Sequence, residues 1–466
     1  MLKFGRPTAD HRLSQATPSE AMSAVPVYSG RFGRQEAERL LWRAGFGPRP
    51  GEADKLAKRG LRGAVLSLTR PPAARLSGPA PRTEDGPLRA HSEWSHDHLW
   101  WLDRMVRSNQ PLVERMALVW HDWFATVKDA APARLMLGQN ALFRRQALGS
   151  FEDLLRGVTR DPAMLLFLSG GDSTKWEPNE NYARELMELF TLGAGRGYTE
   201  RDVREHARAL TGWDYDWREG PGPVNFRYNP EIHDTGAKTI FGRRGPHDWQ
   251  DSVSMCLKHK SHPSFFVSKL WSAFAAGTPP TGTRGALQSL YVRSGYEVRP
   301  VVEAILMHPR IYDGDRVVKP PVVYIAGLLR ALERPIDTGA WGWISDLSGQ
   351  VLFRPPNVAG WDEDRWLDTA TFRARWLAAN YAIGEKRALD TDGEYDTTED
   401  APGAVARALA FWGRPTLSVE TRRQLLAYAE RCQDGIEHSW QERPYRILRQ
   451  NALRMLIATS PDCMTS

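Results

Sequence analysis

The pattern of the whole chain is set out in one stretch, Pro178-Asn179-Glu180-Asn181-Tyr182-Ala183-Arg184-Glu185-Leu186-Met187-Glu188-Leu189-Phe190-Thr191-Leu192-Gly193. On an ideal helix, which turns by about 100° per residue, large apolar side chains of this stretch gather on one face. They are Tyr182, Leu186, Leu189 and Phe190. This spacing predicts an amphipathic helix.

A second face of the same predicted helix is polar. Asn181, Glu185 and Glu188 are three or four residues apart, so their side chains are neighbours and can converge on one ligand. A solvated helix face has the same appearance. Arg184 would then neutralise Glu180 or Glu188 at four-residue spacing without any function. Helix geometry alone leaves both interpretations open.

Helical spacing of apolar residues recurs on both sides of this stretch. Two helix starts are also readable: Asp161-Pro162 is typical of an N-cap followed by proline, and Thr199 with Asp202 of a capping box. Residues 213–245 differ, because they are rich in Gly, Pro, Asp and Asn and show no helical period. We therefore predict a mostly α fold, one large multi-helix domain with long irregular loops and little sheet.

The chain divides into four predicted parts. Residues 1–30 form a mobile polar leader, and residues 31–385 form the main helical domain. An acidic linker follows at residues 386–401. Residues 402–466 form a small helical C-terminal tail that packs on the main domain.

The composition excludes several classes of protein. The net charge of +6 is small for 466 residues and the basic residues lie beside acids, so we do not expect a nucleic-acid-binding protein. Three widely spaced cysteines exclude a disulfide framework. The first 25 residues lack an export signal and no apolar run could cross a bilayer, so we expect a cytoplasmic protein without a membrane span. The 18 tryptophans favour core packing between helices over stacking platforms.

The candidate site combines the polar helix face with the 213–245 loop. Glu185, Glu188, His233 and Asp234 are the candidate catalytic residues; Asn181, Arg184, Lys238 and Trp213 are the candidate substrate-binding residues; His121, Glu185 and Glu188 are the candidate metal ligands. Carboxylates with imidazoles can hold a divalent metal that activates water, or share acid–base work if burial separates their pKa values. Lys238 and Arg184 would face an anionic group.

Structural alternatives stand beside this site. His121 is flanked by Trp120 and Phe124, which is typical of a packed aromatic cluster. His233-Asp234 is also typical of a turn held by the Asp side chain. The composite site requires His233 to lie within roughly 10 Å of Glu185 and Glu188, given metal–ligand bonds near 2 Å.

Several motifs together resemble one bacterial family, the domain of unknown function 1800. They are Arg43-Ala44-Gly45-Phe46-Gly47, residues 120–126 (WHDWFAT), residues 179–193, residues 207–213 (ARALTGW), His233-Asp234-Thr235-Gly236 and residues 355–361 (PPNVAGW). The resemblance covers about residues 31–383 and extends through the tail, and it departs from the usual pattern at Asp122 and Trp123. It implies a mostly helical domain and supplies no catalytic residue. Genes for sulfatase-like proteins with export signals often neighbour this family, which implies an envelope link and a sulfatase-like partner.

Two functions follow from these observations. The first is a hydrolase-type enzyme with a carboxylate/histidine site, with or without a divalent metal, acting on an anionic or sugar-like substrate. The second is a non-catalytic helical scaffold or partner-binding protein, whose glycine-rich motifs fix loops and helix ends. A serine nucleophile elbow, a Walker loop and a dinucleotide fingerprint are absent from the sequence.

Overall fold

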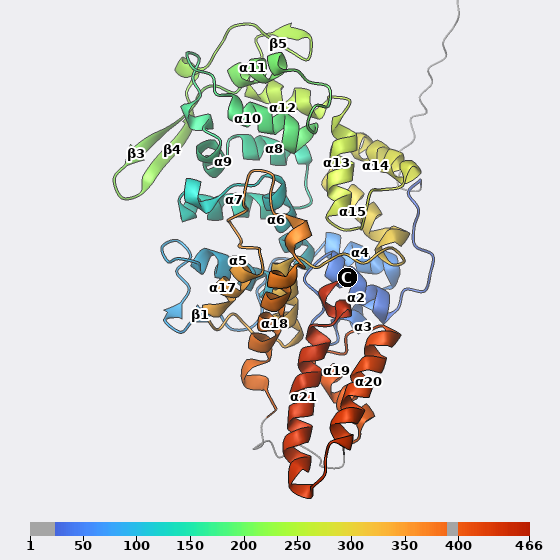
Figure 1. Cartoon of the computed structure of the whole chain (residues 1–466). Coiled ribbons are helices and arrows are strands. Elements are labelled where there is room, and N and C mark those ends of the chain that lie inside the picture. The colour runs from blue at the N-terminus through green and yellow to red at the C-terminus, as the bar shows by residue number, and fades with distance from the viewer. Residues whose placement is uncertain (1–23, 389–398) are drawn as a thin grey trace, which may run out of the picture.

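The computed structural model describes residues 24–388 and 399–466, and helices dominate it (Figure 1). The prediction of a mostly α fold is confirmed. The helices are α2 (Arg34–Arg43), α3 (Glu52–Ala57), α4 (Gly60–Thr69), α5 (His96–Arg107), α6 (Pro111–Trp123), α7 (Ala133–Arg145), α8 (Phe151–Thr159), α9 (Pro162–Phe167), α10 (Glu180–Glu185), α11 (Glu200–Ala209), α12 (Trp249–Leu257), α13 (His262–Ser272), α14 (Thr281–Arg293), α15 (Val298–Met307), α16 (Pro321–Ala331), α17 (Ala340–Leu347), α18 (Thr369–Ile383), α19 (Ala401–Phe411), α20 (Val419–Asp434), α21 (Glu442–Ala458) and α22 (Pro461–Met464).

Both helix starts that the sequence indicated are present. The Asp161 carboxylate accepts a hydrogen bond from the Met164 N–H at 3.1 Å at the start of α9. At the start of α11 the Thr199 hydroxyl and the Asp202 carboxylate each accept the other residue's backbone N–H. These bonds satisfy N–H groups that have no partner within the helix.

The helix that begins with α10 extends beyond Glu185, but its geometry changes there. It continues directly into a π-helical turn, η3 (Leu186–Thr191), in which the chain is wound more widely. The backbone N–H of Leu192 reaches back five residues to the carbonyl of Met187 at 2.8 Å. Such π turns are rare and occur frequently at functional sites.

Three two-stranded antiparallel sheets accompany the helices: β1 (Arg82–Thr83) with β2 (Gly86–Pro87), β3 (Trp213–Arg218) with β4 (Gly222–Tyr228), and β5 (Lys238–Ile240) with β6 (Arg243–Gly245). The prediction of an irregular loop over 213–245 is therefore wrong in part. Aromatic and acidic residues alternate along β3, as a hairpin strand requires. Tyr215 on β3 stacks on Phe226 of β4, with ring centroids 5.1 Å apart.

Apolar side chains from most helices form the hydrophobic core. Its largest fully buried side chains include five tryptophans, which supports core packing as their main use: Trp101, Trp120, Trp123, Trp271 and Trp341. Among the described residues, no helix is long and apolar enough to cross a membrane.

The C-terminal helices α19 to α21 project from one end of the main body (Figure 1). They are nevertheless attached to it by specific contacts. The Tyr324 hydroxyl on α16 donates to the Ala458 carbonyl at 3.0 Å, and Lys319 N–H donates to the Met464 carbonyl at 3.0 Å. At the other end, Val25 is buried, so packing begins before Arg31. Residues 1–23 and 389–398, which include most of the predicted leader and linker, lie outside the described residues.

Candidate functional site

The predicted catalytic face of α10 is only partly available to a ligand. Asn181 is exposed, and Arg184 forms ion pairs with Glu200 at 2.8 Å and with Glu180 at 3.2 Å. Glu185 is half-buried; burial and then the nearby charge of Glu188 raise the pKa of its carboxyl. Arg184 is therefore committed to its own neighbours, whereas the two glutamates repel each other.

We expect Glu185→Gln to raise the free energy of unfolding at neutral pH by up to about 0.5 kcal/mol, as expected for a surface site. Because the folded protein binds the Glu185 proton more tightly than the unfolded chain does, charging this group costs stability above its folded pKa. The gain should therefore vanish at acid pH. Urea denaturation across pH measures this. Glu180→Gln, which removes a carboxylate paired with Arg184, is the control and should lower stability slightly. A loss of stability in Glu185→Gln at neutral pH would contradict the prediction.

The His233-Asp234 segment is a stapled turn, as the structural alternative proposed. His233 Nδ1 lies 2.9 Å from the Thr211 carbonyl. Asp234 pairs with Arg208 at 2.7 Å and accepts the Gly236 N–H at 2.8 Å. Although burial opposes the effect, these bonds hold the pKa of the Asp234 carboxyl below its usual value.

The two remaining candidate residues of the 213–245 segment, Lys238 and Trp213, make contacts within the protein. Lys238 is 1% exposed, and its ammonium donates to the Asp234 and Gly236 carbonyls. Trp213 packs between Tyr228 and Trp249, with ring centroids 5.5 Å away in each case. In the described part of the chain, no hydrogen bond or ion pair joins these loop residues to Glu185 or Glu188.

The predicted metal site of His121, Glu185 and Glu188 is wrong. Within residues 24–388 and 399–466, no group of three or more His, Cys, Asp or Glu side chains is placed to hold a metal ion. His121 is 1% exposed, and burial lowers its pKa to about 3. Its ring is surrounded by aromatic rings: Trp101, Phe143, Phe353 and Trp361. His121 therefore lies in an aromatic cluster, but its rings come from other segments and not from the neighbouring Trp120 and Phe124 that the alternative named.

The π-helical turn has a different use from the one predicted. Three consecutive carbonyls of this turn accept hydrogen bonds from side chains of other helices: Lys269 Nζ to Leu189 at 3.2 Å, Trp123 Nε1 to Phe190 at 3.1 Å and His262 Nδ1 to Thr191 at 3.0 Å. These are the carbonyls of the last three residues of the helix, which have no partners inside it. The carbonyls of the turn therefore hold the Lys269 ammonium and the Trp123 indole N–H in place.

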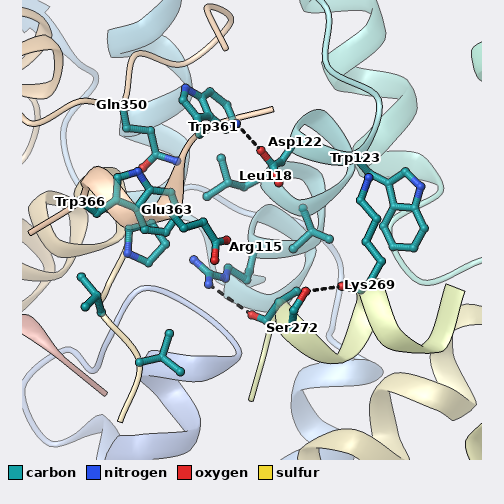
Figure 2. Close-up of a pocket in the computed structure, with 15 residues that line it drawn as sticks. Arg115, Leu118, Asp122, Trp123, Lys269, Ser272, Gln350, Trp361, Glu363 and Trp366 are labelled. Atoms are coloured by element: carbon teal, nitrogen blue, oxygen red, sulfur yellow. Dashed lines mark hydrogen bonds between the residues drawn. The ribbon is translucent and has the colours of Figure 1, made fainter. Parts of the chain in front are cut away.

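Lys269 and Trp123 both line a pocket between α6, α13, the start of α16 and the 350–366 loop (Figure 2). The cavity holds about 120 Å³, against the roughly 10–15 Å³ that one water molecule needs by the same measure. Its charged and polar lining residues are Arg115, Asp122, Lys269, Ser272, Gln350 and Glu363. Its apolar walls include Leu118, Val119, Trp361 and Trp366.

Asp122 is fixed at this pocket by the 355–361 motif. Its carboxylate accepts the backbone N–H of Trp361 at 2.8 Å. The preceding residue, Gly360, has a φ of +100°, and a Cβ there would lie 2.2 Å from Asp122 Oδ1. Glycine is therefore needed both for the backbone conformation and for the approach of the carboxylate. Burial raises the pKa of Asp122, opposed by the Trp361 hydrogen bond.

Lys269 carries the opposite charge on another wall of the pocket. Its ammonium lies 4.8 Å from the centroid of the Trp123 ring, a cation–π contact, and donates to the Leu189 carbonyl. Burial lowers the pKa of Lys269 to about 8, although the charge of Asp122 opposes this. No salt bridge of 4.0 Å or less joins Lys269 to Asp122 in the described chain.

Arg115 and Glu363 complete the charged lining. Arg115 is 9% exposed, and burial lowers its pKa to about 10, so it stays charged at neutral pH. Glu363 is exposed at the pocket mouth, and Figure 2 shows its carboxyl directed toward Arg115. Partial burial, and then the charge of Asp122, raise the pKa of Glu363.

The sequence contained signals for part of this pocket. Asp122 and Trp361 lie in two of the recognised motifs, and Lys269 is a single charge within the apolar run Phe265-Phe266-Val267-Ser268-Lys269-Leu270-Trp271. Arg115 likewise lies in the largely apolar helix α6. A lone cation in an apolar helical run indicates a buried charge that needs a specific environment.

Comparison with known proteins identifies a family whose function is unknown. The family model described as "Protein of unknown function (DUF1800)" matches residues 39–465. The match includes the C-terminal helices as well as the main body. No curated protein and no solved structure matches the chain.

Proposed function

The chain belongs to the DUF1800 family, and from the geometry of its pocket we propose that the protein is a hydrolase-type enzyme. One observation carries the proposal. Lys269 and Asp122 line the same cavity with opposite charges but form no salt bridge of 4.0 Å or less within the described residues. Opposite charges in a low-dielectric site attract strongly unless other contacts hold them apart.

Each group is held by partners of its own. The Leu189 carbonyl and the Trp123 ring hold the ammonium, and the Trp361 N–H holds the carboxylate. Both are thus pre-organised before a substrate enters, which is the arrangement that lowers the cost of reaching a charged transition state. A small substrate placed between them would meet a base on one side and an acid on the other.

The chemistry that fits this arrangement is acid–base hydrolysis. The Asp122 carboxylate takes a proton from a water molecule, whose oxygen bonds to the electrophilic centre of the substrate. The bond to the leaving group breaks, and the leaving group takes a proton from the Lys269 ammonium. Exchange with solvent then restores both protonation states. General acid and base groups each contribute roughly 10²–10⁴-fold to rates when their pKa values lie near the working pH.

The proposal is tested with chromogenic carboxylate, phosphate and sulfate esters and glycosides. We expect turnover in at least one class, and a loss of about 10²-fold or more in kcat for Lys269→Met and Asp122→Asn. The control is Lys175→Met, an exposed lysine stacked on Trp176, which should keep wild-type activity. No turnover in any class, or variants as active as the wild type, would refute the proposal.

The pH dependence follows from the charge states. Because Lys269 acts as the acid, the hydrolytic activity of the enzyme should fall as the pH rises through about 8. In that range the Lys269 ammonium loses its proton. An amine-acylating reagent at pH 8 tests the same property without a substrate. Lys269 should react faster than Lys175, measured by peptide mass spectrometry. Lys319, whose pKa burial also lowers to about 7, is 2% exposed and shielded from the reagent. Equal labelling of Lys269 and Lys175 would contradict the expected shift.

A partner-binding role is the second candidate, and one surface favours it. Helices α17 and α18 pack against each other and expose four large apolar side chains: Trp343, Leu347, Phe372 and Trp376. Exposed apolar clusters of this kind often mark protein–protein contacts. Under this alternative, Trp376→Ser would weaken partner capture, whereas Lys269→Met would leave partner capture unchanged.

A further inference from the structure

The polar atoms that the pocket leaves without partners are all hydrogen-bond donors. Among its lining residues, the buried side-chain atoms without a partner in the described structure are Arg115 Nε and Nη1, Trp361 Nε1 and Trp366 Nε1. None of the carboxylate or amide oxygens of the described lining residues is both buried and without a hydrogen-bond partner. Buried polar groups nearly always have partners, so a set of unpartnered donors indicates a missing acceptor.

Arg115 is the strongest of these donors. Its one hydrogen bond, from Nη2 to the Ala273 carbonyl, is long at 3.5 Å. No carboxylate lies within 4.0 Å of it in the described residues; Glu363 and Asp122 act on it only at longer range. A charge in this position is costly to bury unless an opposite charge reaches it.

Other buried arginines of this protein show the contrast. Arg330 is 1% exposed and pairs with Glu52 at 3.0 Å. Arg375 is fully buried and donates from Nε and Nη2 to the carbonyls of Trp366 and Lys319, at distances of 2.7–3.1 Å. Arg115 lines a cavity, has no ion pair of 4.0 Å or less among the described residues and has only the long hydrogen bond to the Ala273 carbonyl.

We infer that Arg115 is the centre of an oxyanion subsite, so that the substrate carries a carboxylate, phosphate or sulfate group that accepts hydrogen bonds from the unpartnered N–H groups of this guanidinium. The inference rests on the proposed function and names its substrate class. A guanidinium N–H donates a charge-assisted hydrogen bond to an oxygen of such an anion, and Arg115 has two nitrogens without a partner, Nε and Nη1. The nearby indole N–H groups of Trp361 and Trp366 are further donors without partners.

The position of Arg115 also limits the shape of the substrate. Arg115 and Asp122 both belong to α6 and are seven residues apart, so they lie on the same side of the helix. Seven residues span about 10 Å along a helix. The anionic group and the bond to be cleaved are therefore separated by up to about this distance, and the apolar residues Leu118 and Val119 lie between them.

The test uses inorganic phosphate, sulfate and acetate as probes, with chloride at equal ionic strength as the reference. Isothermal titration calorimetry should show binding of at least one oxyanion to the wild type and at least about tenfold weaker binding to Arg115→Met, the loss expected for a charge-assisted hydrogen bond. Arg115→Lys keeps the charge but has one nitrogen donor in place of three, and it should bind with intermediate affinity. Arg145→Met, at an exposed arginine, should bind as the wild type does. Tighter binding of acetate would indicate that the substrate carries a carboxylate, and tighter binding of phosphate or sulfate would indicate a tetrahedral anion.

The outcomes separate this inference from the proposed function. Absence of oxyanion binding to the wild type, or undiminished binding to both Arg115 variants, would overturn the subsite. Loss of oxyanion binding in Lys269→Met alone would place the anion at Lys269, and the subsite would be wrong while acid–base hydrolysis stood. A third outcome is that oxyanion binding depends on Arg115 but turnover is unaffected by Lys269→Met and Asp122→Asn. This would support the subsite and refute the proposed reaction.

Discussion

Replacing Glu114 by glutamine should lower the free energy of unfolding by about 3 kcal/mol, the lower part of the range for breaking a buried ion pair from one side. Glu114 is 1% exposed on α6. It accepts hydrogen bonds from Arg104 of α5 at 3.1 Å and from Arg144 of α7 at 2.8 and 3.0 Å. The substitution keeps the side-chain shape and leaves two arginines without their shared counter-ion.

Urea denaturation measures the effect, and Glu420→Gln is the matched control. Glu420 pairs with Arg423 at 2.7 Å, but both side chains are about two-thirds exposed, at 64% and 65%. Exposed ion pairs contribute little to stability because water screens them, so this control should stay close to the wild type. A Glu114→Gln variant as stable as the Glu420→Gln variant would mean that Arg104 and Arg144 are solvated independently of Glu114.

Replacing Gly360 by alanine should cost about 2 kcal/mol or more, because two effects add. A non-glycine residue at a φ of +100° costs about 1–3 kcal/mol through backbone strain. The new Cβ would also lie 2.2 Å from Asp122 Oδ1, so the carboxylate and the Trp361 N–H could not keep their hydrogen bond. Hydrolytic activity, if it uses Asp122, should fall with the stability.

Gly349→Ala isolates the backbone effect. Gly349 has a φ of +83°, but a Cβ there would meet its nearest neighbour, Thr371 Cγ2, at an ordinary 3.5 Å. The excess cost of Gly360→Ala over Gly349→Ala therefore reports the contact with Asp122. In an Asp122→Ala background, that excess should shrink, which a double-mutant cycle of urea denaturation measures. The backbone carbonyl of residue 122, 2.9 Å from the added Cβ, remains in this background, so an unchanged excess would show that the Asp122 carboxylate is not the obstructing group.

Local features were the part of the site that the sequence could predict. The stretch from Glu180 to Thr191 is helical, and the capping residues Asp161 and Thr199 act at short range, where sequence neighbours decide the outcome. The same short-range signals indicated a turn at His233-Asp234. Alternation along β3 was also present in the sequence, although its interpretation as irregular loop was wrong in part.

The choice of which charged residues meet depended on contacts between distant segments. The prediction placed His233 near Glu185 because polar loop residues need partners and the helix offers carboxylates; the structure places His233 Nδ1 2.9 Å from the Thr211 carbonyl. Asp122, Lys269 and Arg115 meet at one cavity across more than a hundred residues of chain. Nothing in the periodicity of a single helix shows which neighbour it packs against.

The sequence by itself determined the fold class, the helix starts and the family, because apolar periodicity, capping side chains and motifs are properties of consecutive residues. The tertiary structure alone decided the π turn at Leu186–Thr191 and the burial of His121. It also decided the separation of Lys269 from Asp122 and left Nε and Nη1 of Arg115 without partners. Each of these depends on which atoms reach a group from other segments, and therefore on packing that no local pattern encodes.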